Sequence, residues 1–208
     1  MRLALVAFGA VLLLTAGLAA IGVLSGATRD DPDRGQFRGN EAIPGLTLPN
    51  FELRDQNGRL VRTEDLRGTV VVLTFLDTRC TEACPIIARQ IADTWRLLTP
   101  SERSRIIAVA ITTDPRDDTR ANVRAFLVRQ RARGTIRYLV GTAPVMRPLW
   151  RRFQILSSLE SGKANIHSAP VRIYGPDLSW LATQHAGADL SPRNLAHDIR
   201  VALSAKAS

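Results

Sequence analysis

One segment constrains the fold more than any other, because it places two cysteines between a buried strand and a helix. Residues 69–76 read TVVVLTFL, and a continuous apolar run rich in β-branched residues is typical of a strand buried on both faces of a sheet. Cys80 and Cys84 follow the strand, and Pro85 suits the first turn of a helix. Apolar residues at helical spacing then continue to Leu98. The segment therefore predicts a central sheet that is covered by helices.

Strands and helices alternate along the rest of the chain. The predicted elements are a hairpin of 46–53 and 60–61 around a turn at 55–58, a strand at 105–112, a helix at 118–133, a strand at 136–140, a helix at 143–153, a hairpin of 171–174 and 180–184, and a helix from 191 to about 203. This alternation predicts an α/β sandwich in which helices flank a central mixed sheet.

The N-terminal residues are apolar enough to cross a membrane. Residues 3–24 carry no charged side chain, and as a helix they would span ~33 Å against a hydrocarbon core of ~30 Å. We expect residues 1–26 to be a single transmembrane helix that anchors the protein, although Ser25-Gly26-Ala27 would suit the cleavage site of a signal peptide.

The residues after this segment divide into a spacer and a domain. Residues 27–44 are rich in Asp, Arg, Gly and Pro, which predicts a flexible spacer, and residues 45–208 then form one domain. A single N-terminal apolar segment most often exports the domain that follows it. We therefore expect the N-terminus in the cytoplasm and the globular domain in the periplasm or an equivalent compartment.

The chain is basic, yet its charge pattern argues against nucleic-acid binding. There are 28 Lys and Arg residues against 19 Asp and Glu, a net charge of +9, but the basic residues are interspersed with acidic ones. Aromatic residues make up 5% of the chain, too few for stacking on bases. We expect a solvated basic surface with some attraction to anionic lipid headgroups.

The two cysteines lie where a thiolate is stabilised. Amides at a helix N-terminus and the nearby cation of Arg79 both favour thiolate over thiol, which serves redox exchange as well as soft-metal binding. Thioredoxin-type dithiols have two residues between the cysteines, whereas the three residues between Cys80 and Cys84 make a looser pair that can hold a metal. Structural zinc requires four ligands, so two thiolates and one imidazole fit Cu(I) better. The chain offers three candidates for the imidazole: His167, His185 and His197.

Several motifs within residues 44–205 resemble the Sco/SenC family, the membrane-anchored, thioredoxin-like copper proteins of cytochrome c oxidase assembly. They are Phe75-x-x-Thr78-x-Cys80-x-x-x-Cys84-Pro85, Ile111-Thr112-Thr113-Asp114-Pro115 with Asp118-Thr119, His167-Ser168-Ala169, and the closing Ser191-Pro192. The resemblance implies a thioredoxin-like fold and a copper ion, Cu(I) or Cu(II), with Cys80, Cys84 and His167 as its ligands. It implies a supporting rather than a ligating role for Asp114.

The function that the resemblance implies is that of a metallochaperone rather than an enzyme. Such a protein delivers copper to the binuclear copper site of cytochrome c oxidase, and its partner is the copper-binding subunit of the oxidase or another copper chaperone. The same cysteines allow an alternative, a thiol–disulfide oxidoreductase that reduces client cysteines before metal is loaded and does not need His167. A sensor would need a second domain for output, and a peroxidase would need a Thr where Asp77 stands.

Five positions depart from the family pattern: Asp77, Thr81, Asp117, Ile166 and Gly175. None of them is a predicted ligand. Residues around a metal site change its affinity about 10- to 100-fold. We therefore expect these positions to alter the copper affinity or the choice of client.

Overall fold

Strand β4 (Val70–Leu76) lies inside the sheet of the computed structural model, which describes residues 36–205. All residues of β4 are buried. Its even-numbered apolar residues enter one hydrophobic core, and its odd-numbered residues enter a second core on the opposite face. The apolar run is uninterrupted because a strand covered on both faces has no side that meets water.

The strands of the described residues form one mixed sheet in the order β1-β8-β7-β4-β5-β6-β2-β3. The bounds of the other strands are β1 Asn40–Glu41, β2 Glu52–Asp55, β3 Leu60–Arg62, β5 Ile106–Thr112, β6 Ile136–Val140, β7 Val171–Tyr174 and β8 Trp180–Gln184. Strands β4, β5 and β6 run parallel, and the other neighbouring pairs are antiparallel. The carboxyl ends of β4 and β5 and the amino end of β7 therefore meet at one end of the sheet.

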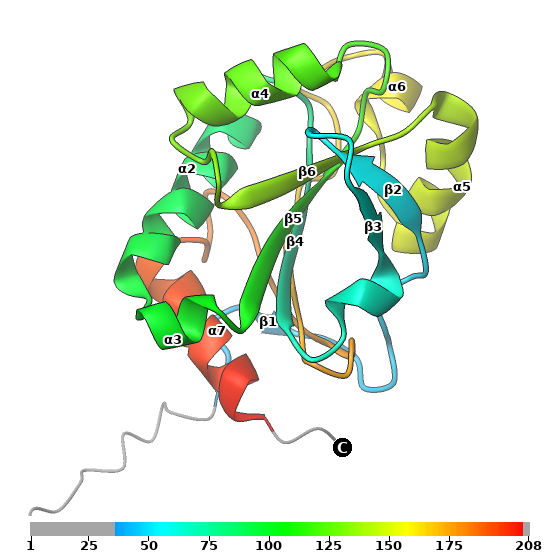
Figure 1. Cartoon of the computed structure of the whole chain (residues 1–208). Helices are drawn as coiled ribbons and strands as arrows, with labels where there is room; N and C mark the ends of the chain where they lie inside the picture. Colours follow the sequence, from blue (N-terminus) through cyan, green and yellow to red (C-terminus); the bar gives the residue numbers. More distant parts are fainter. Residues whose placement is uncertain (1–35, 206–208) are drawn as a thin grey trace, which may run out of the picture. The chain divides into compact units, whose positions relative to one another are not determined.

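Helices cover both faces of the sheet (Figure 1). Their bounds are η1 Thr63–Leu66, α2 Ala83–Leu97, α3 Pro100–Arg103, α4 Arg120–Arg129, α5 Ala143–Phe153, α6 Ser158–Ser161 and α7 Pro192–Ser204. Helices α2, α4 and α7 contribute to the core on one face, while α5 packs on the other face with the β2–β3 hairpin. The predicted mixed sheet flanked by helices is confirmed.

Most of the predicted elements have the expected bounds. Four of them match to the residue: the strands at 136–140, 171–174 and 180–184 and the helix at 143–153. The first hairpin strand begins at Glu52 rather than at Leu46, because the backbone groups of Leu46 and Leu48 bond to the hairpin of β7 and β8 instead. The short helices α3 and α6 are not predicted, since four residues are too few to show a helical period.

Part of the predicted spacer belongs to the folded domain. Strand β1 lies within residues 27–44 and pairs with β8. The amide of Gly39 also donates to the buried Asp198 carboxylate of α7 over 2.9 Å. The flexible segment expected at 27–44 is therefore structured at its C-terminal end. The predicted anchor, residues 1–26, lies outside the described residues, and no helix within residues 36–205 is long and apolar enough to cross a membrane.

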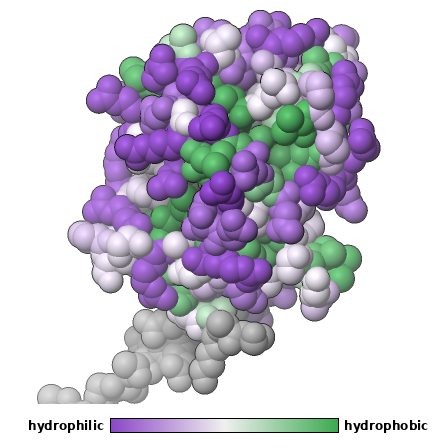
Figure 2. Space-filling view, turned by 45° about the vertical axis from the view of Figure 1, so that its right-hand side comes forward, coloured by the Kyte–Doolittle hydropathy of each residue, from purple (hydrophilic) through white to green (hydrophobic). Residues whose placement is uncertain are grey.

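The surface of the domain is mostly hydrophilic, with apolar groups visible between the polar ones (Figure 2). The large apolar side chains of Ile43, Leu46, Ile86 and Ile166 are between 42% and 74% exposed. Ile86 follows the cysteine pair in α2, and Ile166 directly precedes His167. The surface around the predicted ligands is therefore partly apolar.

Candidate metal centre

The sheet topology brings the cysteine loop and the His167 loop to one place. Residues 77–82 connect the carboxyl end of β4 to α2, so that Cys80 lies in the loop and Cys84 lies in the first turn of the helix. Strand β7 is antiparallel to β4. The residues that precede β7, His167 among them, therefore lie beside the carboxyl end of β4.

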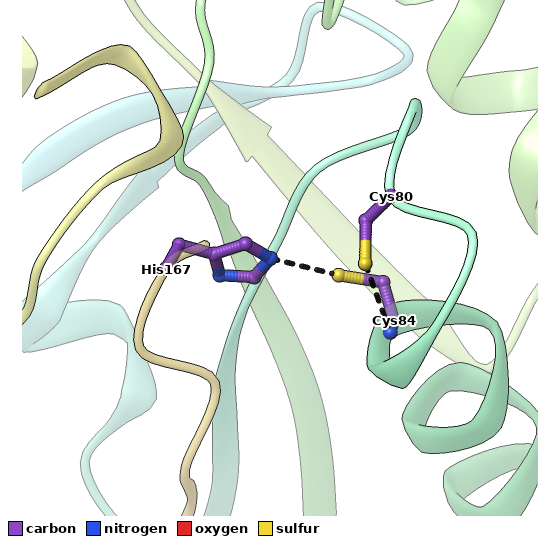
Figure 3. A group of neighbouring side chains, drawn as sticks. All are labelled: Cys80, Cys84 and His167. Carbon is purple, nitrogen blue, oxygen red and sulfur yellow. Dashed lines mark hydrogen bonds between the residues drawn. The ribbon is translucent and has the colours of Figure 1, made fainter. Parts of the chain in front are cut away.

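The side chains of Cys80, Cys84 and His167 converge (Figure 3). The Sγ of Cys84 lies 3.1 Å from the Nε2 of His167, and the amide of Cys84 donates to the Sγ of Cys80 over 3.4 Å. The ligand atoms of the three residues all lie within 4.8 Å of one another. Of the three histidines, His167 is thus the one whose ring meets the sulfurs.

The other two histidines do not join this group. His185 follows β8 at the same end of the sheet, but its side chain is exposed. The Nδ1 of His197, in α7, lies 3.1 Å from the carboxylate of Asp198. Because β8 ends where β7 begins, His185 is a reasonable candidate ligand from its position in the sequence. Only the packing of the side chains separates it from His167.

A backbone carbonyl orients the ring of His167. Its Nδ1 lies 3.1 Å from the carbonyl oxygen of Ser168, and because that oxygen can only accept, Nδ1 carries a proton. Burial, the largest single effect, lowers the pKa of His167, but the pKa is raised overall by the Cys80 sulfur, the Ser168 carbonyl and the charge of Asp77. Nε2 is the nitrogen that faces the sulfurs, so it is the ligand atom available to a metal.

The two cysteines share one proton unequally. The pKa of Cys80 is lowered to about 4, first by the hydrogen bond from the Cys84 thiol and further by bonds from His167 and the Cys84 amide, against the effect of burial. The pKa of Cys84 is raised, first by the same bond to Cys80, then by burial and by the charge of Cys80. Cys80 is therefore the thiolate, and binding of a metal through both sulfurs would release the proton of Cys84.

Asn165 ties the histidine loop to the cysteine loop. Its Oδ1 accepts from the amide of Thr81 over 2.9 Å, and its Nδ2 donates to the Glu82 carboxylate over 2.9 Å. Sequence reasoning missed this residue, because nothing in its pattern sets it apart from other loop asparagines. Its place two residues before His167 is the one signal that could have drawn attention to it.

Arg79 and Asp114 anchor the cysteine loop to the end of β5. The guanidinium of Arg79 pairs with the buried Asp114 over 2.6 Å and with Asp117 over 2.9 Å. Arg79 is thus turned toward these carboxylates, and the largest contribution to lowering the pKa of Cys80 comes from Cys84 instead. Asp114 holds the loop through Arg79 and is not a member of the three-residue group.

Asp77 brings a buried carboxylate close to the sulfurs. Its Oδ1 accepts from the amide of Arg79 over 2.7 Å, while its buried Oδ2 has no hydrogen-bond partner among the described residues. Its amide lies 3.5 Å from the Sγ of Cys84, and its charge contributes to raising the pKa values of Cys84 and His167. Asp77 therefore favours positive charge at the site, which is the charge that a metal ion supplies.

The group can be approached from two sides. Cys84 is fully buried and Cys80 is 4% exposed. Cys80 lines a cavity of about 250 Å³ together with Pro85 and Gln130, and the half-buried His167 lines a separate pocket. A partner would therefore reach Cys80 or His167 before it reached Cys84.

Two sulfurs and one imidazole nitrogen make a soft donor set. Thiolates select soft ions such as Cu(I), whereas structural zinc takes four ligands. Within residues 36–205, no fourth Cys, His, Asp or Glu belongs to the group. The donors fit a soft ion of low coordination number, and the same two thiols could also be oxidised to a disulfide.

A curated relative supports the resemblance found in the sequence. The SCO2-like protein RP587 of Rickettsia prowazekii (strain Madrid E) is 36% identical to the chain over 110 residues. This match covers 52% of the chain and 53% of the relative, so the chain spans about half the length of that relative.

Solved structures share the fold. Bradyrhizobium japonicum ScoI with copper bound matches with a TM-score of 0.64 at 20% identity, over 76% of this chain and 99% of ScoI. BsSco, described as a member of the Sco family of cytochrome c oxidase assembly proteins with a disulfide switch, matches with a TM-score of 0.64 at 21% identity, over 80% and 98%. At these identities the likeness shows the fold, and it is the thioredoxin-like fold that the resemblance implied.

The model of the SCO1/SenC family matches residues 41–204. This range contains Cys80, Cys84, His167 and Asp114. It begins at the second residue of β1 and covers all of the other described strands in full. A match over most of the chain, with the predicted ligands brought together in space, establishes that the chain belongs to the SCO1/SenC family.

Proposed function

We propose that the protein binds one copper ion through Cys80, Cys84 and His167 and delivers it to the binuclear copper site of cytochrome c oxidase. The observation that carries the proposal is the convergence of two sulfurs and Nε2 within 4.8 Å of one another, from two segments far apart in sequence. ScoI from Bradyrhizobium japonicum, which has the same fold, was solved with copper bound.

Transfer would proceed by ligand exchange with the copper-binding subunit of the oxidase or with another copper chaperone. Cysteine and histidine side chains of the receiving protein would replace the ligands one at a time. His167 and Cys80 each line an open space, whereas Cys84 is enclosed, so Cys84 would be the last ligand to leave. The exposed Ile86 and Ile166 would provide apolar contact with the receiving protein.

One observation favours a second function, thiol–disulfide exchange. The lowered pKa of Cys80, about 4, keeps its sulfur in the nucleophilic thiolate form at neutral pH. Attack by Cys80 on a client disulfide would form a mixed disulfide, and Cys84, after losing its proton, would displace the reduced client and leave a Cys80–Cys84 disulfide. That disulfide would also prevent metal binding, so the two functions exclude each other at any moment.

Copper binding by the full chain in mild detergent, with its cysteines reduced, tests the main proposal. We expect one Cu(I) per chain, held in competition with a Cu(I) chelator. Replacing His167 with Ala or Cys80 with Ser should weaken binding more than the ~10- to 100-fold change that residues around a metal site cause. His185→Ala is the matched control, because His185 is exposed at the same end of the sheet, and it should bind like the unaltered chain.

The same variants separate the two functions. The exchange reaction needs only the cysteines, so His167→Ala should still reduce a disulfide substrate if the protein is an oxidoreductase. Copper binding that is unchanged in His167→Ala would rule out the three-ligand site. No copper binding in the unaltered chain, with disulfide exchange intact, would establish the redox function instead.

We also propose that residues 1–26 anchor the protein in the membrane and that the domain lies in the periplasm or an equivalent compartment. The apolar residues 3–24 support an anchor. An anchor would hold the protein in the same membrane as the oxidase, and the raised local concentration of the two proteins would favour delivery. Proteolysis of intact spheroplasts checks this arrangement. The domain should be digested from outside, and protection until the cells are lysed would contradict the proposal.

A further inference from the structure

Arg172 is a buried cation beside the candidate metal centre. It lies in β7 and is 8% exposed. Its guanidinium carbon lies 4.3 Å from the ring centre of Trp180 and 5.7 Å from that of Phe75. Both rings provide cation–π attraction to the guanidinium.

No carboxylate of the residues that the structure describes neutralises this cation. Among residues 36–205, none lies within 4.0 Å of the guanidinium, and the buried Nε of Arg172 has no hydrogen-bond partner. The neighbouring Tyr174 hydroxyl is a hydrogen-bond partner of the guanidinium but carries no charge to neutralise it, and its pKa is raised by burial and partly lowered again by the charge and the hydrogen bond of Arg172. Burial of a cation without an anionic partner carries a desolvation cost.

Arg172 also lines a pocket of about 740 Å³, a size typical of ligand sites. Apolar side chains that include Ile43, Leu46 and Trp180 form much of the wall. Glu41 is the acidic residue of the lining, and its exposed side chain makes no ion pair with Arg172. The pocket therefore combines an unpaired buried cation with apolar walls.

We propose that this pocket binds a carboxylate carried by an apolar group, with Arg172 bonding the carboxylate and Trp180 packing against the apolar part. A guanidinium can donate two parallel hydrogen bonds to one carboxylate, and such bonds strengthen when water is excluded. A small aromatic acid has this chemistry, and so does an acidic side chain next to an aromatic residue in a peptide.

The position of the pocket gives the occupant a role at the metal centre. His167 lines the same pocket, so a bound group would share the pocket with the histidine ligand. An acidic segment of a partner could thus be recognised at Arg172 while its metal-binding residues approach the ligands. The inference does not depend on copper binding, because Arg172 is not a member of the metal-ligating group.

The test uses the full chain in mild detergent with reduced cysteines and no copper. Phenylacetate is the small acid, acetyl-Asp-Phe-amide is the peptide, and phenylacetamide is the uncharged control for the carboxylate. Binding is measured by calorimetry and by the rise in melting temperature that a ligand of the folded state causes. We expect both carboxylates to bind and phenylacetamide not to bind. Tighter binding of the peptide would indicate a protein as the natural source, and tighter binding of phenylacetate would indicate a small acid.

The key variant is Arg172→Met, which keeps an unbranched apolar side chain and removes the charge. It should weaken carboxylate binding about tenfold to a hundredfold, the range for a lost charged hydrogen bond. Arg151→Met removes an exposed charge from α5, outside the pocket lining, and should leave binding unchanged. We expect Arg172→Met to melt at the same temperature as the unaltered chain or higher, because it removes an unpaired buried cation.

Two results would overturn the inference. One is that neither carboxylate binds the unaltered chain. The other is that Arg172→Met binds both as well as the unaltered chain does, which would place the binding elsewhere. Because the melting temperature of Arg172→Met is measured in the same experiment, loss of binding through unfolding would be recognised.

Discussion

At the scale of single residues, the two cysteines differ chemically although the sequence presents them as a pair. Cys80, in the loop, accepts a hydrogen bond from the first turn of α2, while Cys84 lies inside that turn and is fully buried. The charge of Asp77 further opposes a second thiolate at Cys84. One sulfur is therefore ready to bind or to attack, and the other must first lose a proton.

This difference predicts how alkylation of Cys80 depends on pH. With its pKa lowered to about 4, Cys80 should react with iodoacetamide at a nearly constant rate between about pH 6 and pH 9, because it is already a thiolate. The Cys84→Ala variant removes the largest cause of the shift, so its rate should rise with pH through that range. Cys80→Ser is the control and should react slowly throughout. A rate in the unaltered chain that increases steadily to pH 9 would contradict the assignment of Cys80 as the thiolate.

Asn165 allows a second prediction at this scale. Asn165→Ala removes the bonds that hold the His167 loop to Thr81 and Glu82, so His167 should be less well positioned. We expect Cu(I) affinity to fall about 10- to 100-fold. The bonds are exposed, so thermal stability should change little. Asn50→Ala, at an exposed position away from both loops, is the control. If the two variants had equal Cu(I) affinity, Asn165 would not position the histidine.

At the scale of elements, a network around a buried carboxylate joins three strands to the cysteine loop. Asp118 accepts from the hydroxyls of Thr112, at the end of β5, and Tyr138, in β6, over 2.6 Å each. It also accepts from the amide of Thr78 in the cysteine loop over 2.9 Å, while Tyr138 lies within 2.8 Å of the carbonyl oxygen of Leu76 in β4. The network explains why Asp118 stays inside the fold although burial disfavours its charge.

The network predicts a dependence of stability on pH. Burial raises the pKa of Asp118 from 3.8 to about 6, against the effect of its hydrogen bonds. Between these values the folded state holds more protons than the unfolded state, so this group makes the protein less stable as the pH rises from about 4 to about 6. The loss is on the order of 3 kcal/mol at most.

Urea denaturation of the full chain and of Asp118→Asn at several pH values checks this prediction. The variant cannot titrate at this position, so comparison of the two proteins isolates Asp118 from other groups. The variant should be less stable by about 1–3 kcal/mol at pH 4, because the hydroxyl oxygen of the protonated Asp118 can still accept a hydrogen bond, whereas the amide nitrogen of Asn cannot. Its deficit should shrink as the pH rises toward 7. A deficit that is constant with pH would show that the pKa of Asp118 is not raised.

At the scale of the whole domain, the N-terminal end of the described chain is fastened to its C-terminal helix. Asp198, fully buried in α7, accepts from the amides of Arg38 and Gly39 over 2.7 and 2.9 Å and from Gln184 of β8 over 2.6 Å. The strand β1 follows directly and completes one edge of the sheet. Residues 38–41 are thereby held against α7 and β8.

Removing this attachment should release β1. Asp198→Ala leaves buried donors without a partner, and we expect it to lower the free energy of unfolding by about 1–3 kcal/mol. Hydrogen exchange at residues 38–41 should accelerate more than exchange in β4. Asp198→Asn keeps one accepting oxygen. Its hydrogen-exchange rate at residues 38–41 should lie between the rates of the unaltered chain and of Asp198→Ala. If exchange at residues 38–41 were unchanged in Asp198→Ala, the carboxylate would not be what holds the entry strand.

The sequence by itself determined the central strand, the helix that follows the cysteines and most of the remaining elements, because each carries a local period or a turn signal of its own. The apolar run of β4 could be recognised in the sequence because both faces of the strand are buried. Ser191 could be recognised as a helix cap because serine is a preferred capping residue, and its side chain accepts from the amide of Asn194. The soft-metal chemistry of Cys80 and Cys84 was also predictable, since it follows from their spacing and from the start of α2.

The tertiary structure alone decided which residues join those cysteines. The antiparallel pairing of β7 with β4 brings His167 to the sulfurs, and neither strand direction nor strand order is written in a local pattern. The roles of Asn165 and Asp198 and the burial of the Arg172 Nε without a hydrogen-bond partner among residues 36–205 have the same origin. Each depends on partners far away in the chain, and such contacts are set when the whole sheet assembles rather than by the residues around each position.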